Sequence, residues 1–204
     1  PRLHITLCTA PNREFDMTHT LPSRHRRARS GALAWSLALA LGLSACGSSP
    51  QPADYRAEQP AMDFRGYFSG PVQAHGMFTD RSGRVIKRFT VALQGRWSGD
   101  EGVLEEDFTY SNGEKERRVW QLKDLGGGRF EGRAADIVGV AEGEQAGNAI
   151  RFRYTMRVPV DGKPIEFQFD DWMYRVDGQV VLNRAAMSKF GIHLGDVTLS
   201  FRKP

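Results

Sequence analysis

Residues 150–158 read Ile-Arg-Phe-Arg-Tyr-Thr-Met-Arg-Val, and this stretch decides the fold class. Every second residue is apolar or aromatic, and the residues between them are three arginines and a threonine. Successive side chains of a β-strand point to opposite faces, so this alternation predicts a strand with one dry and one wet face.

The same alternation recurs on both sides of this stretch, between turn signals in which glycine stands with Asp, Asn, Ser or further glycine. These turns are expected at 80–83, 98–100, 111–113, 126–128, 161–162 and 177–178. They separate ten candidate strands, at 71–79, 84–97, 103–110, 117–122, 129–134, 137–141, 149–160, 165–176, 179–190 and 197–201. A short helix is predicted over 62–68, with Asp63 in its first turn.

About ten short-linked antiparallel strands after one short helix predict an all-β, up-and-down meander closed into a barrel of about 8–10 strands. Closure is favoured because it removes exposed strand edges. A sandwich of two sheets is the structural alternative. A barrel of this strand number can enclose a small apolar ligand.

The segment before the strands is typical of a secretory signal. Four arginines and a histidine between residues 24 and 29 precede an apolar run from Gly31 to Leu43. This run of about 13 residues is shorter than the roughly 20 that a spanning helix needs, so we expect it to be cleaved. The run ends in Leu43-Ser44-Ala45-Cys46, which resembles the bacterial lipobox and predicts lipidation of Cys46. The residue after the cysteine is Gly47 and not the aspartate that resembles an inner-membrane retention signal. We therefore expect the protein at the periplasmic face of the outer membrane.

The expected domain organisation has four parts. Residues 1–16 precede Met17, fit no signal design and are interpreted as an upstream artefact, whereas 17–45 form the signal peptide. Residues 46–60 are rich in Pro and Ser and are expected to form a flexible tether. Residues 61–204 have the size of one β-barrel domain.

Charge and cysteine content narrow the function classes. The chain has 28 basic and 24 acidic residues, of which six and two precede Cys46, so 22 of each remain. The remaining chain offers no net basic field, and we expect no nucleic-acid partner. The whole chain has two cysteines, Cys8 and Cys46, and both precede the barrel domain. The barrel domain therefore contains no disulfide.

Six groups of residues between 54 and 203 resemble an uncharacterised family of proteobacterial lipoproteins, domain-of-unknown-function family 3833. They are Asp54-Tyr55-Arg56 with Gln59-Pro60, Gly76-Met77-Phe78 with Asp80-Arg81-Ser82-Gly83, Glu106-Asp107-Phe108, Arg117-Arg118-Val119-Trp120, Asp170-Asp171-Trp172-Met173-Tyr174, and Asn183-Arg184 with Met187-Ser188-Lys189-Phe190-Gly191. This resemblance implies no established activity. A weaker similarity, to lipocalins, rests on Gly95-Arg96-Trp97 and on Arg202 in the last strand, although the Gly-x-Trp motif falls in the second candidate strand and not in the first.

Charged residues on predicted inner faces are the candidate ligand-binding residues. Arg184 shares its strand parity with Val180 and Leu182, so we expect it to point inward, beside Asp170 or Asp171. The apolar alternation changes phase at this acidic pair, which predicts a β-bulge and places Trp172 and Tyr174 on an apolar face. By the same parity rule, Glu106 and Arg118 form a second inward pair. The alternative is that these ion pairs only fix strand register and that the aspartates are solvated.

Motifs for catalysis and metal binding are missing. The mature part contains His75 and His193 without ligand spacing, and none of the common hydrolase, nucleotide or zinc motifs occurs. No catalytic residue, metal or cofactor is expected. The sequence therefore predicts a membrane-anchored, periplasm-facing lipoprotein that binds or carries a small amphipathic molecule, such as a lipid or fatty-acid derivative. The alternatives are a structural or interaction lipoprotein with a filled barrel and, third, a small enzyme acting on a lipid.

Overall fold

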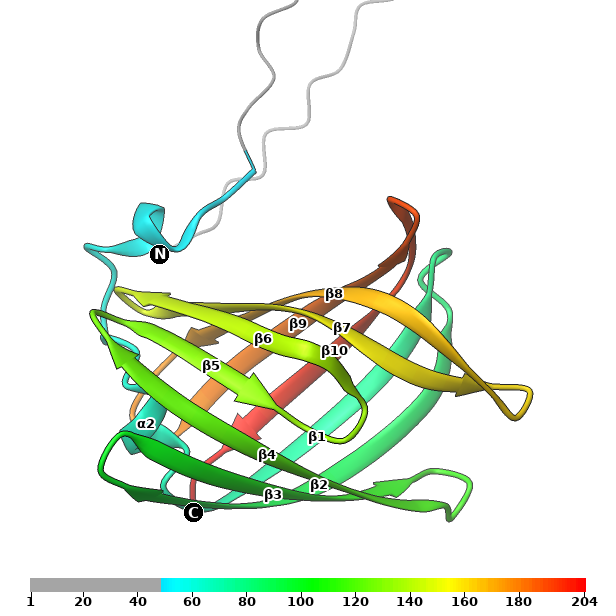
Figure 1. The fold of residues 1–204 in the computed structure, drawn as a ribbon, viewed down its shortest axis with the longest axis horizontal. Helices are drawn as coiled ribbons and strands as arrows, with labels where there is room; N and C mark the ends of the chain where they lie inside the picture. Colours follow the sequence, from blue (N-terminus) through cyan, green and yellow to red (C-terminus); the bar gives the residue numbers. More distant parts are fainter. Residues whose placement is uncertain (1–48) are drawn as a thin grey trace, which may run out of the picture. The chain divides into compact units, whose positions relative to one another are not determined.

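The computed structural model describes residues 49–204, which form ten antiparallel strands closed into a barrel (Figure 1). The predicted leader, the lipidation site Cys46 and the start of the predicted tether lie outside the described residues. The elements are η1 (Pro52–Tyr55), α2 (Phe64–Tyr67), β1 (Gly70–Asp80), β2 (Val85–Ser98), β3 (Glu101–Tyr110), β4 (Lys115–Gly126), β5 (Arg129–Arg133), β6 (Ile137–Ala146), β7 (Ala149–Val160), β8 (Lys163–Arg175), β9 (Val180–Lys189) and β10 (Ile192–Arg202). Within residues 49–204, no helix has both the length and the apolar character that crossing a membrane requires.

Each strand pairs with the next one along the chain, and β1 closes the barrel by pairing with β10 from Gln73↔Arg202 to Asp80↔Gly195. The predicted meander and its closure are therefore confirmed, and the two-sheet alternative is wrong. The strand predicted at residues 149–160 is also confirmed, as β7. Ile150, Phe152 and Met156 of β7 are buried, whereas Arg153 and Arg157 are exposed.

The short helix α2 closes one end of the barrel. Asp63 caps it by accepting a hydrogen bond from the Gly66 amide at 2.8 Å. Phe64 and Phe68 are buried and pack against the rings of Phe130, Phe152 and Phe201, with ring centroids 5.1–5.3 Å apart. This end, which we call the base, is therefore filled by aromatic side chains.

The Gly-Arg-Trp motif at residues 95–97 allows α2 to pack closely against strand β2. A side chain on Gly95 would collide with the carbonyl oxygen of Phe68, so only glycine allows this approach. Trp97 meets the Phe64 ring edge-on, and the Arg65 guanidinium lies 5.2 Å from the centre of the Trp97 ring.

The predicted tether is described from Ser49 onward, and from Pro50 onward the chain makes contacts with the barrel. Pro52 is buried, Met62 donates to the Gly147 carbonyl at 2.6 Å, and Arg151 reaches the carbonyl of Pro50 and the side chain of Gln51 at 3.4 and 3.3 Å. The Pro- and Ser-rich composition indicates a linker. It does not reveal which backbone and side-chain groups of the segment form hydrogen bonds with the barrel.

Candidate functional site

A polar band crosses the interior of the barrel above the base. Its centre is Arg118 of β4, whose Nε donates to Asp136 Oδ2 at 2.8 Å. Arg118 Nη1 lies 3.5 Å from Glu106 Oε2 on β3, and that oxygen also accepts a hydrogen bond from Trp120 Nε1 at 3.2 Å. Glu106 and Arg118 face each other in the β3–β4 ladder, so the predicted inward pair is confirmed as an ion pair.

Asp171 of β8 forms the second part of this band. Its carboxylate accepts a hydrogen bond from Tyr154 of β7 at 3.1 Å and another from the amide nitrogen of Asn183 on β9. Asn183 also donates to the Trp172 carbonyl at 3.1 Å, which fixes the orientation of its amide. Three neighbouring strands are thereby joined through one buried carboxylate.

The electrostatics of the band are dominated by acids. Burial raises the pKa of Asp171 to about 6, against the opposing effect of the Asn183 and Tyr154 hydrogen bonds. Burial also raises the pKa of Glu106, although Arg118 opposes this rise. Burial lowers the pKa of Arg118, but Glu106 and Asp136 outweigh it and the net change is upward, so the arginine stays charged. The band therefore contains one cation and the carboxyl groups of Glu106, Asp136 and Asp171, and a fourth carboxyl group, that of the exposed Glu116, lies 3.7 Å from Arg118 Nη2. Glu106 and Asp171 hold protons more tightly than usual.

The interior is filled below the band, and above it a second cluster of buried side chains lies on strands β6–β9: Ile137, Met156, Phe167, Phe169, Ala185 and Met187. At the base Val72, Ile150 and Val181 are fully buried. At the other end of the same strands, the inward side chains of Phe78 and Val158 remain partly exposed although the wall surrounds them. Glu106 and Arg118 also retain 12% and 16% of their side-chain exposure. The outermost inward side chains and the Glu106–Arg118 pair are therefore partly accessible to solvent.

The expected inward position of Arg184 is wrong. Its side chain is 69% exposed on the outer face of β9 and bonds Asp196 of β10 at 3.1 Å, not Asp170 or Asp171. The inward residues of β9 are instead Val181, Asn183, Ala185 and Met187. The apolar run Val180-Val181-Leu182 fits both strand faces, so it could not fix which face is inside.

The predicted β-bulge at Asp170-Asp171 is also wrong, because β8 pairs without a register shift with both β7 and β9. Regular alternation turns Asp171 inward and Asp170 outward, where it binds Arg151 through two bonds of 2.5 and 2.6 Å. Trp172 and Tyr174 are outward too.

The reason for these outward aromatic residues is the N-terminal segment that packs over them. Trp172 and Tyr174 stack on each other and meet the ring of Tyr55 from η1, with centroids 5.7 and 5.3 Å away. The Arg151 guanidinium lies 4.8 Å from the centre of the Trp172 ring. Trp172 and Tyr174 are therefore aromatic because η1 covers this part of the outer face of β8. The alternation of inward and outward side chains along β8 does not change.

Sequence reasoning missed three members of the polar band. Tyr154 was expected inside, but only as an apolar contact, and Asn183 was placed outside by the wrong parity of β9. Asp136 lies in the turn before β6, where no periodicity predicts orientation. Its Oδ1 atom is buried and accepts no hydrogen bond from the described residues.

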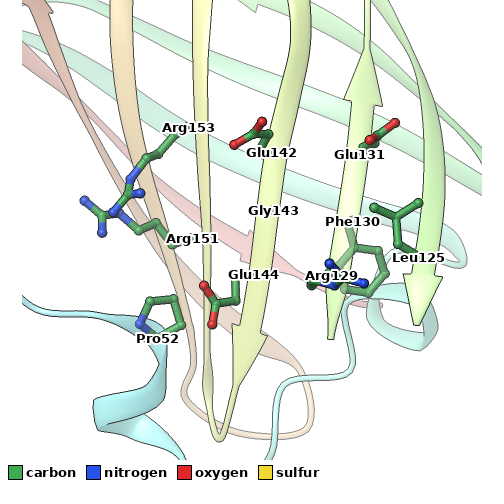
Figure 2. A pocket seen from close by; sticks show the side chains of 10 residues that line it. All are labelled: Pro52, Leu125, Arg129, Phe130, Glu131, Glu142, Gly143, Glu144, Arg151 and Arg153. Carbon is green, nitrogen blue, oxygen red and sulfur yellow. The ribbon is translucent and has the colours of Figure 1, made fainter. Parts of the chain in front are cut away.

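Two shallow pockets, of about 370 and 400 Å³, lie on the outer wall. Figure 2 shows the first, beside Pro52, where Arg151 and Arg153 lie near Glu142 and Glu144. Opposite charges alternate there, so the pocket favours neither an anion nor a cation. In residues 49–204, no three His, Cys, Asp or Glu side chains are arranged to hold a metal ion.

Comparison with known proteins identifies a family. The model of a family described as "Protein of unknown function (DUF3833)" matches residues 40–203. No curated protein matches the chain. One similar solved structure is the S-type phycobiliprotein lyase CPES from Guillardia theta, with 10% sequence identity and a TM-score of 0.49, covering 76% of this chain and 99% of that one.

Proposed function

This chain belongs to the DUF3833 family, and we propose that it is a lipid-anchored, periplasm-facing protein that binds a small amphipathic molecule inside its barrel. The observation that carries the proposal is a partly solvent-accessible polar band inside the barrel, between the aromatic base and a second apolar cluster nearer the other end. A buried ion pair alone is weak evidence for stability, because desolvation offsets much of its attraction. A polar group in an otherwise apolar, accessible interior is typical of a site that orients a ligand.

The chemistry of the band favours a particular polar group on the ligand. Arg118 is already bonded to Glu106 and Asp136, so an incoming carboxylate or phosphate would have to displace an acid. The buried Oδ1 of Asp136 still needs a hydrogen-bond donor. The proposed ligand is therefore an amphipathic molecule with a hydroxyl, amide or amine head, whose apolar part contacts Phe78, Val158 and Ile165.

Native mass spectrometry of the detergent-extracted protein tests this function. We expect an added mass that is released on denaturation, and we expect Arg118→Met to lower the bound fraction. Arg184→Met is the matched control, because it removes an exposed arginine of the outer wall and should leave the bound fraction unchanged. A wild-type protein without any bound small molecule would refute ligand binding.

The anchor is tested separately by intact mass. We expect a mature chain that begins at Cys46 and carries acyl groups, and an unprocessed precursor for Cys46→Ser. A mature N-terminus elsewhere, without acyl mass, would remove the anchor from the proposal.

The second candidate is a structural or interaction lipoprotein with a filled barrel. The aromatic packing of the base and the position of both pockets on the outer wall favour it. The same mass measurement separates the two candidates, because a filled barrel carries no small molecule.

A further inference from the structure

Exposed apolar side chains gather on the rim at the end of the barrel opposite α2. They belong to three hairpin turns, and each is more than a third exposed. We call this set the rim patch: Val85, Ile86, Val160, Phe190 and Ile192.

The three hairpins are consecutive around the barrel. The turn between β9 and β10 lies beside the β1–β2 turn, because β10 pairs with β1. On its other side the neighbouring hairpin is β7–β8, whose tip extends beyond the β8–β9 ladder, which begins at Gln168↔Ser188. Figure 1 shows the β9–β10 and β1–β2 turns next to each other, at the end opposite α2. The rim patch therefore covers one side of the entrance to the interior.

Phe190 has two energetically unfavourable features, its exposure to solvent and its backbone conformation, and the fold explains neither. It is 88% exposed, and its φ of 52° is in the left-handed region that an aromatic residue rarely adopts. Strain of this kind persists where function requires it, and a hairpin tip could use Asn or Gly at no such cost.

Basic residues surround the rim patch. The three turns, residues 80–86, 160–163 and 189–192, contain four basic and two acidic side chains. Asp80 is bonded to Arg84, whereas Arg81 and Lys163 form no ion pair within residues 49–204. The ammonium group of Lys189 lies 5.0 Å from the centre of the Phe190 ring. An exposed aromatic side chain among lysines and arginines is complementary to the interface of a bilayer that contains anionic phospholipid.

We propose that this rim docks on a phospholipid bilayer, with Phe190 and Ile192 inserted among the lipids and the surrounding basic side chains at the headgroups. This contact goes beyond the proposed ligand binding and does not require it. It would place the entrance of the barrel against the phase in which amphipathic molecules are stored.

Site-specific fluorescence tests the docking on the full lipidated chain. Residues 49–204 contain no cysteine, so an environment-sensitive label can be placed at Ser82→Cys, in the β1–β2 turn. Asn112→Cys, in the β3–β4 turn outside the rim patch, is the matched control position. Protein in carrier vesicles is mixed with acceptor vesicles of phosphatidylethanolamine and phosphatidylglycerol, and brominated lipid is placed in one vesicle population or the other.

We expect quenching of the Ser82 label and not of the Asn112 label, and the brominated population identifies which bilayer is contacted. Replacing both Phe190 and Ile192 by Ser should lower the apparent affinity at least about tenfold, because two apolar side chains lose their burial. Leu182→Ser, which changes an apolar position on the outer wall that is 48% exposed, should have no effect. Equal quenching at the two label positions, no quenching on any vesicle, or an unaffected double variant would overturn the proposal. A docked rim without any co-purifying molecule would refute the ligand and leave the docking intact.

Discussion

Asp171 couples the polar band to pH. Its pKa of about 6 in the folded barrel is above the usual value of 3.8, because burial disfavours the charged form. The folded state therefore holds this proton more tightly than the unfolded state does. The free energy of unfolding must fall as the pH rises through the window from about 4 to about 6. Glu106 acts in the same direction.

Asp171→Asn should remove a large part of this fall. The variant keeps an acceptor for Asn183 and a donor for the Tyr154 hydroxyl, so its hydrogen bonds can persist. The wild type should lose about 2 kcal/mol between pH 4 and 6, out of roughly 3 kcal/mol over the whole titration, and the variant clearly less. Denaturant unfolding at a series of pH values measures this, with Asp107→Asn on the exposed face of β3 as control. A variant whose stability varies with pH as steeply as the wild type would contradict the assignment.

Strand parity predicts a site residue only where the apolar residues select one face. Leu104 and Phe108 flank Glu106 without apolar residues at the intervening positions, so its inward direction follows from the sequence. On β9 apolar residues occupy both faces, and Arg184 was placed on the wrong one. The decisive residue there is Asn183, whose partner Asp171 belongs to another strand.

At the scale of elements, the base depends on close contact between α2 and β2. Gly95→Ala would force the Phe68 carbonyl away from the wall and separate the packed aromatic rings. We expect a loss of roughly 2–5 kcal/mol, comparable to a large core truncation. Gly178→Ala is the control, because its side chain would point into open space. Thermal unfolding of both variants measures the difference, and equal melting temperatures would show that α2 contributes little to the barrel.

The ten strands were predictable because period-two alternation and turn glycines are local signals. The contacts of η1 were not, because they depend on which outer faces lie next to the chain after the barrel has closed. Trp172 and Tyr174 illustrate this, since their apolar character was correct and their face was not.

At the scale of the whole molecule, Pro50, near the start of the described residues, and the rim patch lie at opposite ends of the barrel. Pro50 contacts Arg151 near the start of β7, whereas Val160 ends that strand at the rim. A strand of 13 residues such as β8 spans roughly 30 Å along the axis of a barrel with tilted strands. A lipid anchor at Cys46 would be only four residues from Pro50, a reach of at most about 14 Å.

This short reach predicts that an anchored barrel stays close to its own membrane. A donor dye at Glu58→Cys, an exposed position after η1, should transfer energy efficiently to an acceptor dye in the carrier bilayer. Inserting about 20 Gly and Ser residues after Ser49 should lower the transfer, because such a linker has a mean span of about 25 Å. The same insertion after Asn112 should leave the transfer unchanged, since that turn lies at the far end of the barrel. If lengthening the link has no effect, the barrel is held at the bilayer by its own surface, and the rim patch is then the surface to test first.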